Sequence, residues 1–436
     1  MPDQGLTRDR GTRCHRSRVP DVTGTDPHIV IVGAGQAGLQ AAETLRSEGF
    51  EGRVTLLGAE PHAPYQRPPL SKAWLMDKLD PEQLTLRDPS VLERKQIDLC
   101  TGASVSAIDV RSQAVLLRDG RALAYTGLVL ATGATPRQLP QAQEAGDLVR
   151  TLRSRADADA IARGLQNCAQ MKLPLVVVGG GFIGLEVAAS ARKLGIEVTV
   201  LEAAPRLLER VLSAELSAWY ARLHADRGAT LIFEARIAEI RKITAHAVEV
   251  QLSDGRCIVA GLVVAGIGVT PNDELARAAG IVCENGIVVD PCGRTSVPNV
   301  VAAGDCTVRR LLDGTMLRLE SVQNAVEQGR SAACALLGTD KPSLGTPWFW
   351  SDQYDMKLQI AGLSRGADTH VLRGDMGGHS FSIFHFRESR LVAVDSINAA
   401  RDHMVARDLI GRQISPTAQQ AGDAAFNLAK LRTVQA

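Results

Sequence analysis

The sequence predicts an α/β protein in which two βαβ modules, one inserted into the other, precede a smaller C-terminal α+β domain. Two stretches, "IVIVGAGQAGLQAAETLRSEGFEGRVTLL" at 29–57 and "LVVVGGGFIGLEVAASARKLGIEVTVLE" at 175–202, share one plan of strand, glycine turn, helix and strand. Forty glycines against 4% aromatic residues fit the many tight strand-to-helix turns of such folds. From about Gly345 the composition changes, and hairpin signals such as "GDMGGHSFSIFHFRESRLVAVDS" indicate an antiparallel sheet.

Length and composition set the first limits on function. A chain of 436 residues, 45% of them apolar, is long enough for about three domains with buried cores. Its formal charge of +1 provides no basic field, so a nucleic-acid partner is not expected. The eight cysteines have no CxxC spacing, which gives no support to a metal site, an iron–sulfur cluster or a thioredoxin-like motif. Scattered single cysteines are typical of a reducing compartment.

Neither the N-terminal stretch nor the most apolar stretch of the chain predicts a targeting or membrane segment. Residues 1–27 hold five arginines and four aspartates without an apolar segment, so we expect a disordered extension rather than a secretory signal. The best candidate for a membrane span, residues 173–191, contains Pro174, three consecutive glycines and Glu186, which argue against it. We therefore expect a cytoplasmic protein without a membrane partner.

The first module is expected from about His28, where a strand leads into the G-x-G-x-x-G turn of Gly33, Gly35 and Gly38. In such a turn the first glycine makes the tight bend, and the second lets the backbone approach a pyrophosphate. The third lets the helix pack closely on the strand. The free N–H groups at the start of the helix then bind the phosphates. This context favours a Rossmann-like dinucleotide site over simple close packing.

The second module repeats the pattern with Gly179, Gly181 and Gly184. Its second strand ends at Glu202, 23 residues after Gly179, where an acid is expected to meet a ribose. A carboxylate there accepts hydrogen bonds from the ribose hydroxyls and repels a 2′-phosphate, which favours NADH over NADPH. We interpret the nearby Arg206 as part of a surface ion pair rather than as a phosphate ligand.

Two acids have two interpretations each. Glu186, predicted in the first turn of the second module's helix, either complements the helix dipole or faces the nicotinamide. Asp305 follows an apolar strand in "AAGDC" at 302–306. It either binds a cofactor hydroxyl at the mouth of a parallel sheet or caps the next helix, which we expect from about Ser321.

Nine motifs then occur in a fixed order: "VGAGQAG", "PYQRPPLSK", "LVLATGATPR", "VRTL", "GGGFIGLEVA", "AGIGVTPN", "VPNVVAAGDC", "RLESVQNAVEQ" and "PWFWSDQYD". Together they resemble the FAD-containing, NADH-dependent ferredoxin reductases of oxygenase systems, which are flavoproteins with two dinucleotide-binding domains of the glutathione-reductase type. The resemblance covers about residues 28–410. It implies that residues 28–131 and 262–342 bind FAD, that residues 132–261 bind NADH, and that residues 343–436 form the C-terminal α+β domain.

The resemblance also implies roles for individual residues. It places the following at FAD: Gly33, Gly35, Ala37, Gly38, Glu60, Arg67, Lys72, Val105, Thr132, Gly133, Arg150, Asp305 and Val322. It places the following at NADH: Gly179, Gly181, Ile183, Gly184, Glu186, Glu202 and Gly268. Lys72, Glu186 and Trp350 would serve the reaction itself, with Trp350 beside the flavin edge. From the residues alone, Lys72 is equally a solvated loop lysine, and Trp350 is more readily a core residue.

The implied activity is hydride transfer from NADH to FAD, followed by single-electron transfers to a [2Fe–2S] ferredoxin. That ferredoxin would serve a haem monooxygenase or a ring-hydroxylating dioxygenase. Related disulphide reductases carry a redox cysteine pair after the first glycine turn, whereas "EPHAPYQRPPLSKAWL" at 60–75 has none, so electrons should leave the flavin directly. Alternatives of the same fold are a rubredoxin reductase, an NADH oxidase, or an NADH-responsive binding flavoprotein like the apoptosis-inducing factors.

One position departs from the family pattern. Ala59 stands where the family usually has the acid that binds the FAD ribose, and we expect the next residue, Glu60, to take that role. We further hypothesise that Arg309, Arg310 and Arg330 form a docking patch for an acidic ferredoxin around Trp350. The alternative is that these arginines are paired within the fold.

Overall fold

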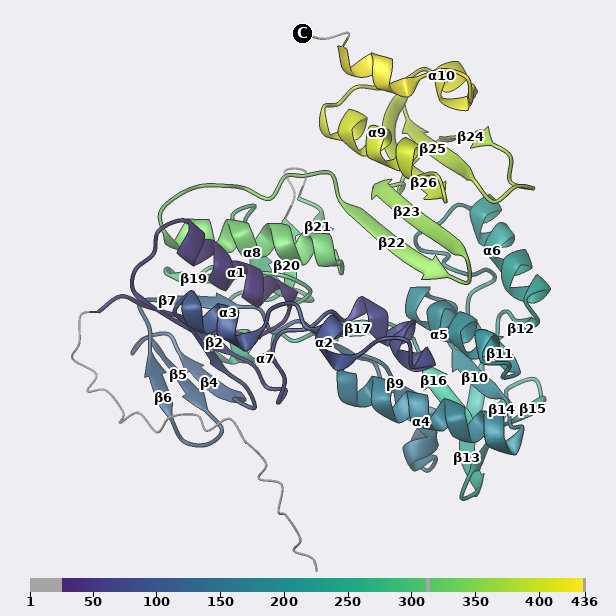
Figure 1. Ribbon diagram of the computed structural model, residues 1–436, viewed down its shortest axis with the longest axis horizontal. Helices are drawn as coiled ribbons and strands as arrows, with labels where there is room; N and C mark the ends of the chain where they lie inside the picture. The colour runs from purple at the N-terminus through teal and green to yellow at the C-terminus, as the bar shows by residue number, and fades with distance from the viewer. Residues whose placement is uncertain (1–25, 311–313, 434–436) are drawn as a thin grey trace, which may run out of the picture.

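The computed structural model describes residues 26–310 and 314–433, so all but the last two residues of the predicted N-terminal extension lie outside the described residues. Three bodies follow one another in space: the first module, the second module and the C-terminal domain, which packs on the second module (Figure 1). This confirms the predicted α/β class with two parallel-sheet modules and a separate α+β domain.

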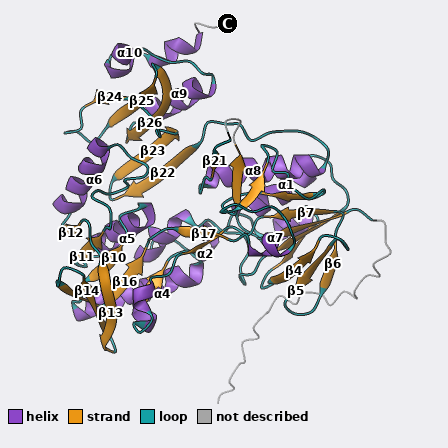
Figure 2. Cartoon of the chain, turned by 180° about the vertical axis from the view of Figure 1, so that it is seen from behind, coloured by secondary structure: helices purple, strands orange, loops and turns teal. Residues whose placement is uncertain are grey.

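The first module is a five-stranded parallel sheet with the order β19-β7-β1-β2-β3. Its core elements are β1 (His28–Val32), α1 (Gln36–Ser47), β2 (Arg53–Leu57), β3 (Ile97–Cys100), β7 (Gly127–Leu130), β19 (Val300–Ala302) and α8 (Val322–Leu336). Successive side chains of a strand point to opposite faces. Ile29 and Ile31 therefore pack with α1 and α8. Val30 and Val32 pack with the antiparallel sheet of β4 (Val105–Asp109), β5 (Ala114–Leu117) and β6 (Ala122–Ala124), seen from behind in Figure 2.

The second module has the same plan, with the order β12-β11-β10-β16-β9. Its elements are β9 (Val149–Thr151), α4 (Arg155–Met171), β10 (Leu175–Val178), α5 (Phe182–Lys193), β11 (Val198–Leu201), α6 (Ala214–Asp226), β12 (Ala229–Ile232) and β16 (Leu262–Ala265). One face of the sheet packs on α4, α5 and α6. The other packs on β13 (Ile237–Thr244), β14 (Ala247–Leu252) and β15 (Cys257–Ala260).

One predicted boundary is wrong. The sequence analysis assigns residues from 262 onward to the first module, but β16 pairs with β10 in the second sheet, with Leu175 opposite Leu262. A short buried strand carries the same apolar run in either sheet, so its composition cannot tell the two apart. The crossing between modules comes after it, where β17 (Val269–Pro271) pairs with β8 (Ala134–Pro136).

Shorter elements complete the first module and its connections. They are η1 (Pro68–Ser71), η2 (Trp74–Met76), α2 (Pro81–Leu84), α3 (Pro89–Arg94), η3 (Pro140–Ala142), η4 (Gly146–Leu148), α7 (Glu274–Ala278), β18 (Ile287–Val289), β20 (Thr307–Arg310) and β21 (Met316–Leu317). β18, β20 and β21 form a small sheet of their own. In the described ranges, no helix is both long and apolar enough to cross a membrane.

The C-terminal domain has an antiparallel sheet with the order β22-β23-β26-β25-β24, as the hairpin signals predict. Its elements are β22 (Trp348–Gln353), β23 (Met356–Gly362), β24 (Thr369–Gly374), β25 (Phe381–Arg387), β26 (Arg390–Ile397), α9 (Ala400–Gly411), α10 (Ala418–Gly422) and η5 (Leu428–Thr433). One face packs on α9. The other packs on α6 of the second module, where the rings of Phe381 and Trp219 lie 5.3 Å apart, edge to face.

Candidate functional site

The first glycine turn has the shape that a phosphate-binding turn needs. Gly33 has a φ of +114°, and a Cβ there would lie 2.0 Å from the carbonyl oxygen of Ala131. A Cβ at Gly38 would lie 1.9 Å from the oxygen of Gly33, so the third glycine permits the close packing of α1. Gly35 has open space beside it and is an N-cap without a capping side chain. The free start of α1, with Ala37 buried in its first turn, therefore fits a pyrophosphate.

The second turn repeats these features. Gly179 has a φ of +103°, and a Cβ at Gly184 would lie 2.2 Å from its oxygen. Gly181 is an N-cap without a capping side chain, and the nearest atom to a Cβ there is the oxygen of Gly266, 3.8 Å away. Ile183 is 41% exposed at the start of α5. The chain thus has two uncapped, open helix starts, each fitted to the phosphates of a dinucleotide.

Glu202 turns back toward the second glycine turn. Its Oε2 accepts from the backbone N–H of Gly180 at 2.6 Å, and its Oε1 accepts from that of Ala204 at 2.7 Å. Each carboxylate oxygen has a further lone pair, so both can still accept from ribose hydroxyls. Arg206 donates to the backbone oxygens of Leu212 and Glu209, both at 2.8 Å, and lies 3.9 Å from the carboxylate of Glu209. Arg206 thus forms an ion pair with Glu209 near the surface, as predicted, and two backbone carbonyls hold it as well.

Lys72 and Glu186 form a buried ion pair between the two modules. The Lys72 ammonium lies 2.6 Å from Oε2 of Glu186, and their side chains are 18% and 6% exposed. The Ser71 hydroxyl donates to the same oxygen at 2.5 Å. This excludes the solvated-lysine interpretation of Lys72. Glu186 is the fifth residue of α5 and not in its first turn, so the helix-dipole interpretation is also wrong.

Glu60 connects two residues of the loop between β2 and η1, Tyr65 and Arg67. Its Oε1 lies 2.7 Å from Nη2 of Arg67, and its Oε2 accepts from the Tyr65 hydroxyl at 2.5 Å. Burial raises the pKa of Tyr65 to about 12, so the phenol keeps the proton that it donates. Arg67 also donates to the backbone oxygen of Arg153 at 2.7 Å. Glu60 thus faces Arg67 and Tyr65, and its part in binding a ribose stays a prediction.

Asp305 lies at the carboxyl end of the first sheet, paired with an arginine that the sequence analysis missed. Arg153 Nη2 lies 2.9 Å from Oδ2 of Asp305 and 3.2 Å from where a Cβ of Gly133 would lie. The predicted Arg150 instead pairs with Asp147 at 2.9 Å. Asp305 precedes strand β20, whereas Ser321 caps α8, so the N-cap interpretation of Asp305 is wrong. The only sequence signal for Arg153 is its place between β9 and α4.

The remaining predicted residues lie at the crossing between the modules, on the C-terminal domain or at the starts of elements of the first module. Thr132 and Asn272 exchange two hydrogen bonds, of 2.6 and 2.9 Å, where the chain crosses between modules. Gly268, with a φ of +99°, has open space beside it. Trp350 is half-buried on β22, with its ring 5.5 Å from that of Trp348, so it is not the core residue that its type suggests. The remaining two lie at element starts: Val105 begins β4, and Val322 begins α8.

The arginine patch is only partly present. Arg309 is half-buried and donates to the backbone oxygen of Ser343, and burial lowers its pKa. Arg310 is exposed and lies 3.7 Å from Glu284. Arg330 is exposed on α8. Arg309 is therefore held within the fold, and Arg330 is the best remaining candidate for a docking contact.

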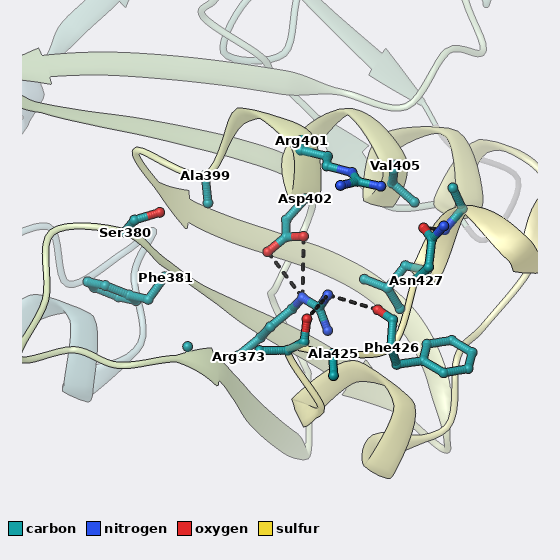
Figure 3. A pocket seen from close by; sticks show the side chains of 14 residues that line it. Arg373, Ser380, Phe381, Ala399, Arg401, Asp402, Val405, Ala425, Phe426 and Asn427 are labelled. Carbon is teal, nitrogen blue, oxygen red and sulfur yellow. Dashed lines mark hydrogen bonds and ion pairs between the residues drawn. The ribbon is translucent and has the colours of Figure 1, made fainter.

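In the described residues the cysteines form no disulphide, and no candidate metal cluster occurs. All seven cysteines in the described residues are free thiols, and only Cys257 is exposed. Among the described residues no group of three or more His, Cys, Asp and Glu side chains could hold a metal ion. A cavity of about 360 Å³ in the C-terminal domain is lined by none of the predicted site residues (Figure 3). Its Arg373 is bonded to Asp402 and to the backbone oxygen of Phe426, at 3.2 and 3.0 Å, and thereby holds the C-terminal segment.

Comparison with known proteins places this geometry in a family. Residues 27–329 match the pyridine nucleotide-disulphide oxidoreductases, over more than half of the chain. The chain belongs to the pyridine nucleotide-disulphide oxidoreductase family. Residues 348–432 match a second description, the reductase C-terminal domain. Both glycine turns, with the uncapped starts of α1 and α5, lie within the matched residues 27–329.

Several oxidoreductases of this family are similar over nearly their whole length. Rhodocoxin reductase of Rhodococcus erythropolis is 45% identical, covering 92% of this chain and 93% of the relative. Putidaredoxin reductase of Pseudomonas putida is 41% identical, covering 93% and 96%. The crystal structure of the ferredoxin reductase for the CYP199A2 system of Rhodopseudomonas palustris is 41% identical with a TM-score of 0.88, covering 93% and 99%. The covalent putidaredoxin reductase–putidaredoxin complex is 40% identical with a TM-score of 0.88, covering 94% and 98%.

Proposed function

We propose that this chain is an NADH-dependent, FAD-containing ferredoxin reductase that supplies electrons to an oxygenase system. The observation that carries the proposal is the Lys72–Glu186 ion pair, which joins two modules that each have a helix start fitted to a dinucleotide. Similar proteins named rhodocoxin reductase, putidaredoxin reductase and the anthranilate 1,2-dioxygenase system's ferredoxin–NAD⁺ reductase component support the activity. When bound, NADH supplies an electron pair with a proton, and FAD accepts the pair and releases single electrons to the ferredoxin.

The residues of the chain bind, orient and neutralise. Gly35 and Gly181 leave the helix starts free for the two pyrophosphates, and Glu202 presents acceptors to the ribose of NADH. Lys72 sets a positive charge at the site, and Glu186 fixes that ammonium in one place. We assign FAD to the first module, with Arg67, Asp305 and Val322 among its contacts. We assign NADH to the second module, and Trp350 would contact the flavin.

The partners follow from the same assignment. We propose a [2Fe–2S] ferredoxin as the electron acceptor, because a structure similar to this chain is a reductase joined to putidaredoxin. The terminal enzyme is then a haem monooxygenase or a ring-hydroxylating dioxygenase. We also propose a cytoplasmic location, which the seven free thiols of the described residues support.

The test is anaerobic titration of the purified protein, followed by reduction of cytochrome c with and without candidate ferredoxins. We expect a yellow protein with one FAD per chain, rapid reduction by NADH, and cytochrome c reduction that depends on a [2Fe–2S] ferredoxin. Preference for rubredoxin, or rapid turnover with oxygen alone, would identify one of the alternatives of the same fold. Slow reduction with a long-lived charge-transfer complex and a change of oligomeric state would indicate a binding flavoprotein instead.

A further inference from the structure

A chain of buried polar side chains ends on Glu186 and has no role in the function proposed above. The Ser351 hydroxyl donates to Oε1 of Glu186 at 2.6 Å, on the side of the carboxylate opposite Lys72. Behind Ser351 lie Gln353 at 3.2 Å and then His224, whose Nε2 is 2.8 Å from the Gln353 carbonyl oxygen. The Tyr354 hydroxyl closes the chain at 3.2 Å from Nδ1 of His224.

The polar side chains of this chain are buried, and burying polar groups costs free energy of folding. Ser351, Gln353 and His224 are each 0% exposed. A buried polar side chain destabilises the fold unless its hydrogen bonds are made. The chain also joins all three bodies: Ser71 and Lys72 come from the first module, Glu186 and His224 from α5 and α6, and the other members from β22 and the turn after it. Figure 1 shows the end of β22 between α5 and α6.

The carboxylate fixes the direction of every hydrogen bond in the chain. An ionised carboxylate only accepts, so the single proton of Ser351 points to Glu186, and Ser351 can then only accept from Gln353. Gln353 therefore turns its NH₂ group to Ser351 and its carbonyl to His224. His224 must then carry its proton on Nε2, which leaves Nδ1 to accept from the Tyr354 hydroxyl. All four donors point toward the one anion, an arrangement in which the bonds strengthen one another.

The protonation of the end groups agrees with this direction. Burial lowers the pKa of His224 to about 4, so the imidazole is neutral near pH 7, as the chain requires. Burial raises the pKa of Tyr354 to about 12, so its hydroxyl keeps the proton that it donates. A charged imidazole would have two donors and no acceptor, and the bond from Tyr354 would be lost.

We propose that Ser351, Gln353 and His224 are positioning residues, a directed chain that holds the Glu186 carboxylate in one orientation and so fixes the Lys72 ammonium at the electron-transfer site. This inference rests on the proposed function, because the position of the Lys72–Glu186 pair affects electron transfer only if the chain binds FAD and NADH. On the other side of Glu186, Lys72 donates to Glu186 and, at 3.1 Å, to the oxygen of Pro68. The carboxylate, which belongs to the second module, is thus held from the first module and from the C-terminal domain at once.

The first test reads the direction of the chain without any turnover. In the FAD-loaded enzyme labelled with ¹⁵N-histidine, His224, assigned through the loss of its signals in His224→Gln, should be neutral with its proton on Nε2. In Glu186→Gln the amide oxygen should stay with Lys72 and Ser71, and the new NH₂ group should face Ser351. Ser351 must then donate to Gln353, Gln353 turns over, and His224 moves its proton to Nδ1. An unchanged His224 tautomer in folded Glu186→Gln would overturn the proposal.

The second test reads the consequence for electron transfer. Gln353→Met keeps a similar volume and removes both hydrogen bonds, so the rate of flavin reduction by NADH should fall about tenfold through misplacement of the Glu186–Lys72 pair. The dissociation constant for NADH should change far less than the rate. The matched control is Ser190→Ala, which removes a buried hydrogen bond of 2.8 Å from the same helix α5 to the backbone of Ser71. Its reduction rate and its His224 signals should match those of the wild type.

The two tests separate the inference from the function on which it rests. If the wild-type enzyme is not reduced by NADH, the proposed function fails, and the tautomer experiment still decides whether the chain is directed. If the wild type is reduced normally and Gln353→Met matches Ser190→Ala in rate, the chain is structural only and the inference is wrong.

Discussion

The two modules share a backbone and differ in the acid beside their glycine turns. In each, the first glycine of the turn donates to the last residue of the second strand, Gly33 to Leu57 and Gly179 to Leu201, both at 2.8 Å. The next position is Gly58 in the first module and Glu202 in the second. The backbone thus sets a phosphate cradle in both, while one side chain decides whether an acceptor for a ribose lies against the turn.

The residue after the first glycine explains how that acid is accommodated. A Cβ at Gly180 would lie 3.0 Å from Oε2 of Glu202, so glycine there leaves the carboxylate its place against the turn. In the first module the same position is Ala34, and a Cβ at Gly58 would lie 2.9 Å from the Ala34 side chain. That space is closed, and the nearest acid, Glu60, braces Arg67 instead. Although the two modules share a fold, the acid of the second contacts the glycine turn, whereas the acid of the first pairs with an arginine.

The largest effect should come from filling each cradle in turn. Gly35→Val places a side chain where phosphates bind, and we expect the protein to purify without FAD. Gly181→Val should keep FAD and raise the KM for NADH about 100-fold, as expected for the loss of two hydrogen bonds to charged phosphates. Flavin absorbance per chain and steady-state kinetics measure the two effects. If both variants lost the same cofactor, the assignment of one dinucleotide to each module would be wrong.

The second prediction contrasts the two acids directly. Glu202→Gln keeps an acceptor for the Gly180 N–H but removes the negative charge that repels a 2′-phosphate and strengthens ribose binding. The ratio of kcat/KM for NADH over NADPH should fall about tenfold or more, the worth of one hydrogen bond to a charged group. Glu60→Gln is the matched control and should leave this ratio unchanged. Equal effects of the two substitutions would remove the distinction between the modules.

Local sequence signals predicted the fold and the two glycine turns. Contacts between residues far apart in the sequence were not predicted. The apolar strands, the glycine spacings and Ser321 as the start of α8 are each encoded within a few residues. By contrast, β16 could belong to either sheet, and Arg153 meets Asp305 across 152 positions of the chain. Gln353 and His224 lie 129 positions apart, and both types are common on surfaces. No local pattern announces such a pair, so the chain behind Glu186 becomes visible only in the assembled domains.

A smaller effect should separate the acceptor side from the NADH side. Arg330→Glu reverses an exposed charge on α8 of the first module. We expect the KM for an acidic ferredoxin to rise about fivefold and its salt dependence to flatten, since rim charges act mainly on association. The control is Arg163→Glu, an exposed arginine on α4 of the second module. Ferricyanide reduction should stay unchanged in both. An equal loss with both acceptors in Arg330→Glu would show that this arginine stabilises the fold.

The smallest effect should come from blocking thiols. This test asks whether electrons pass from NADH to the acceptor through FAD alone, without a cysteine relay. Residues 60–75, which follow the first module's second strand and include Lys72, contain no cysteine. Burial raises the pKa of Cys168 to about 11 and also raises that of Cys306, and thiols held protonated react slowly with alkylating reagents.

Among the cysteines of the described residues, alkylation of the NADH-reduced enzyme with iodoacetamide should therefore modify mainly the exposed Cys257 on β15, a strand of the second module that packs away from α5. Ferricyanide reduction should stay largely unchanged, because residues 60–75 contain no cysteine pair that could carry electrons away from the flavin. Mass spectrometry of the labelled peptides and parallel rate measurements provide the check. A loss of activity that tracks the labelling of one cysteine, in protein that keeps its FAD and its fold, would mean that a thiol carries electrons between the modules.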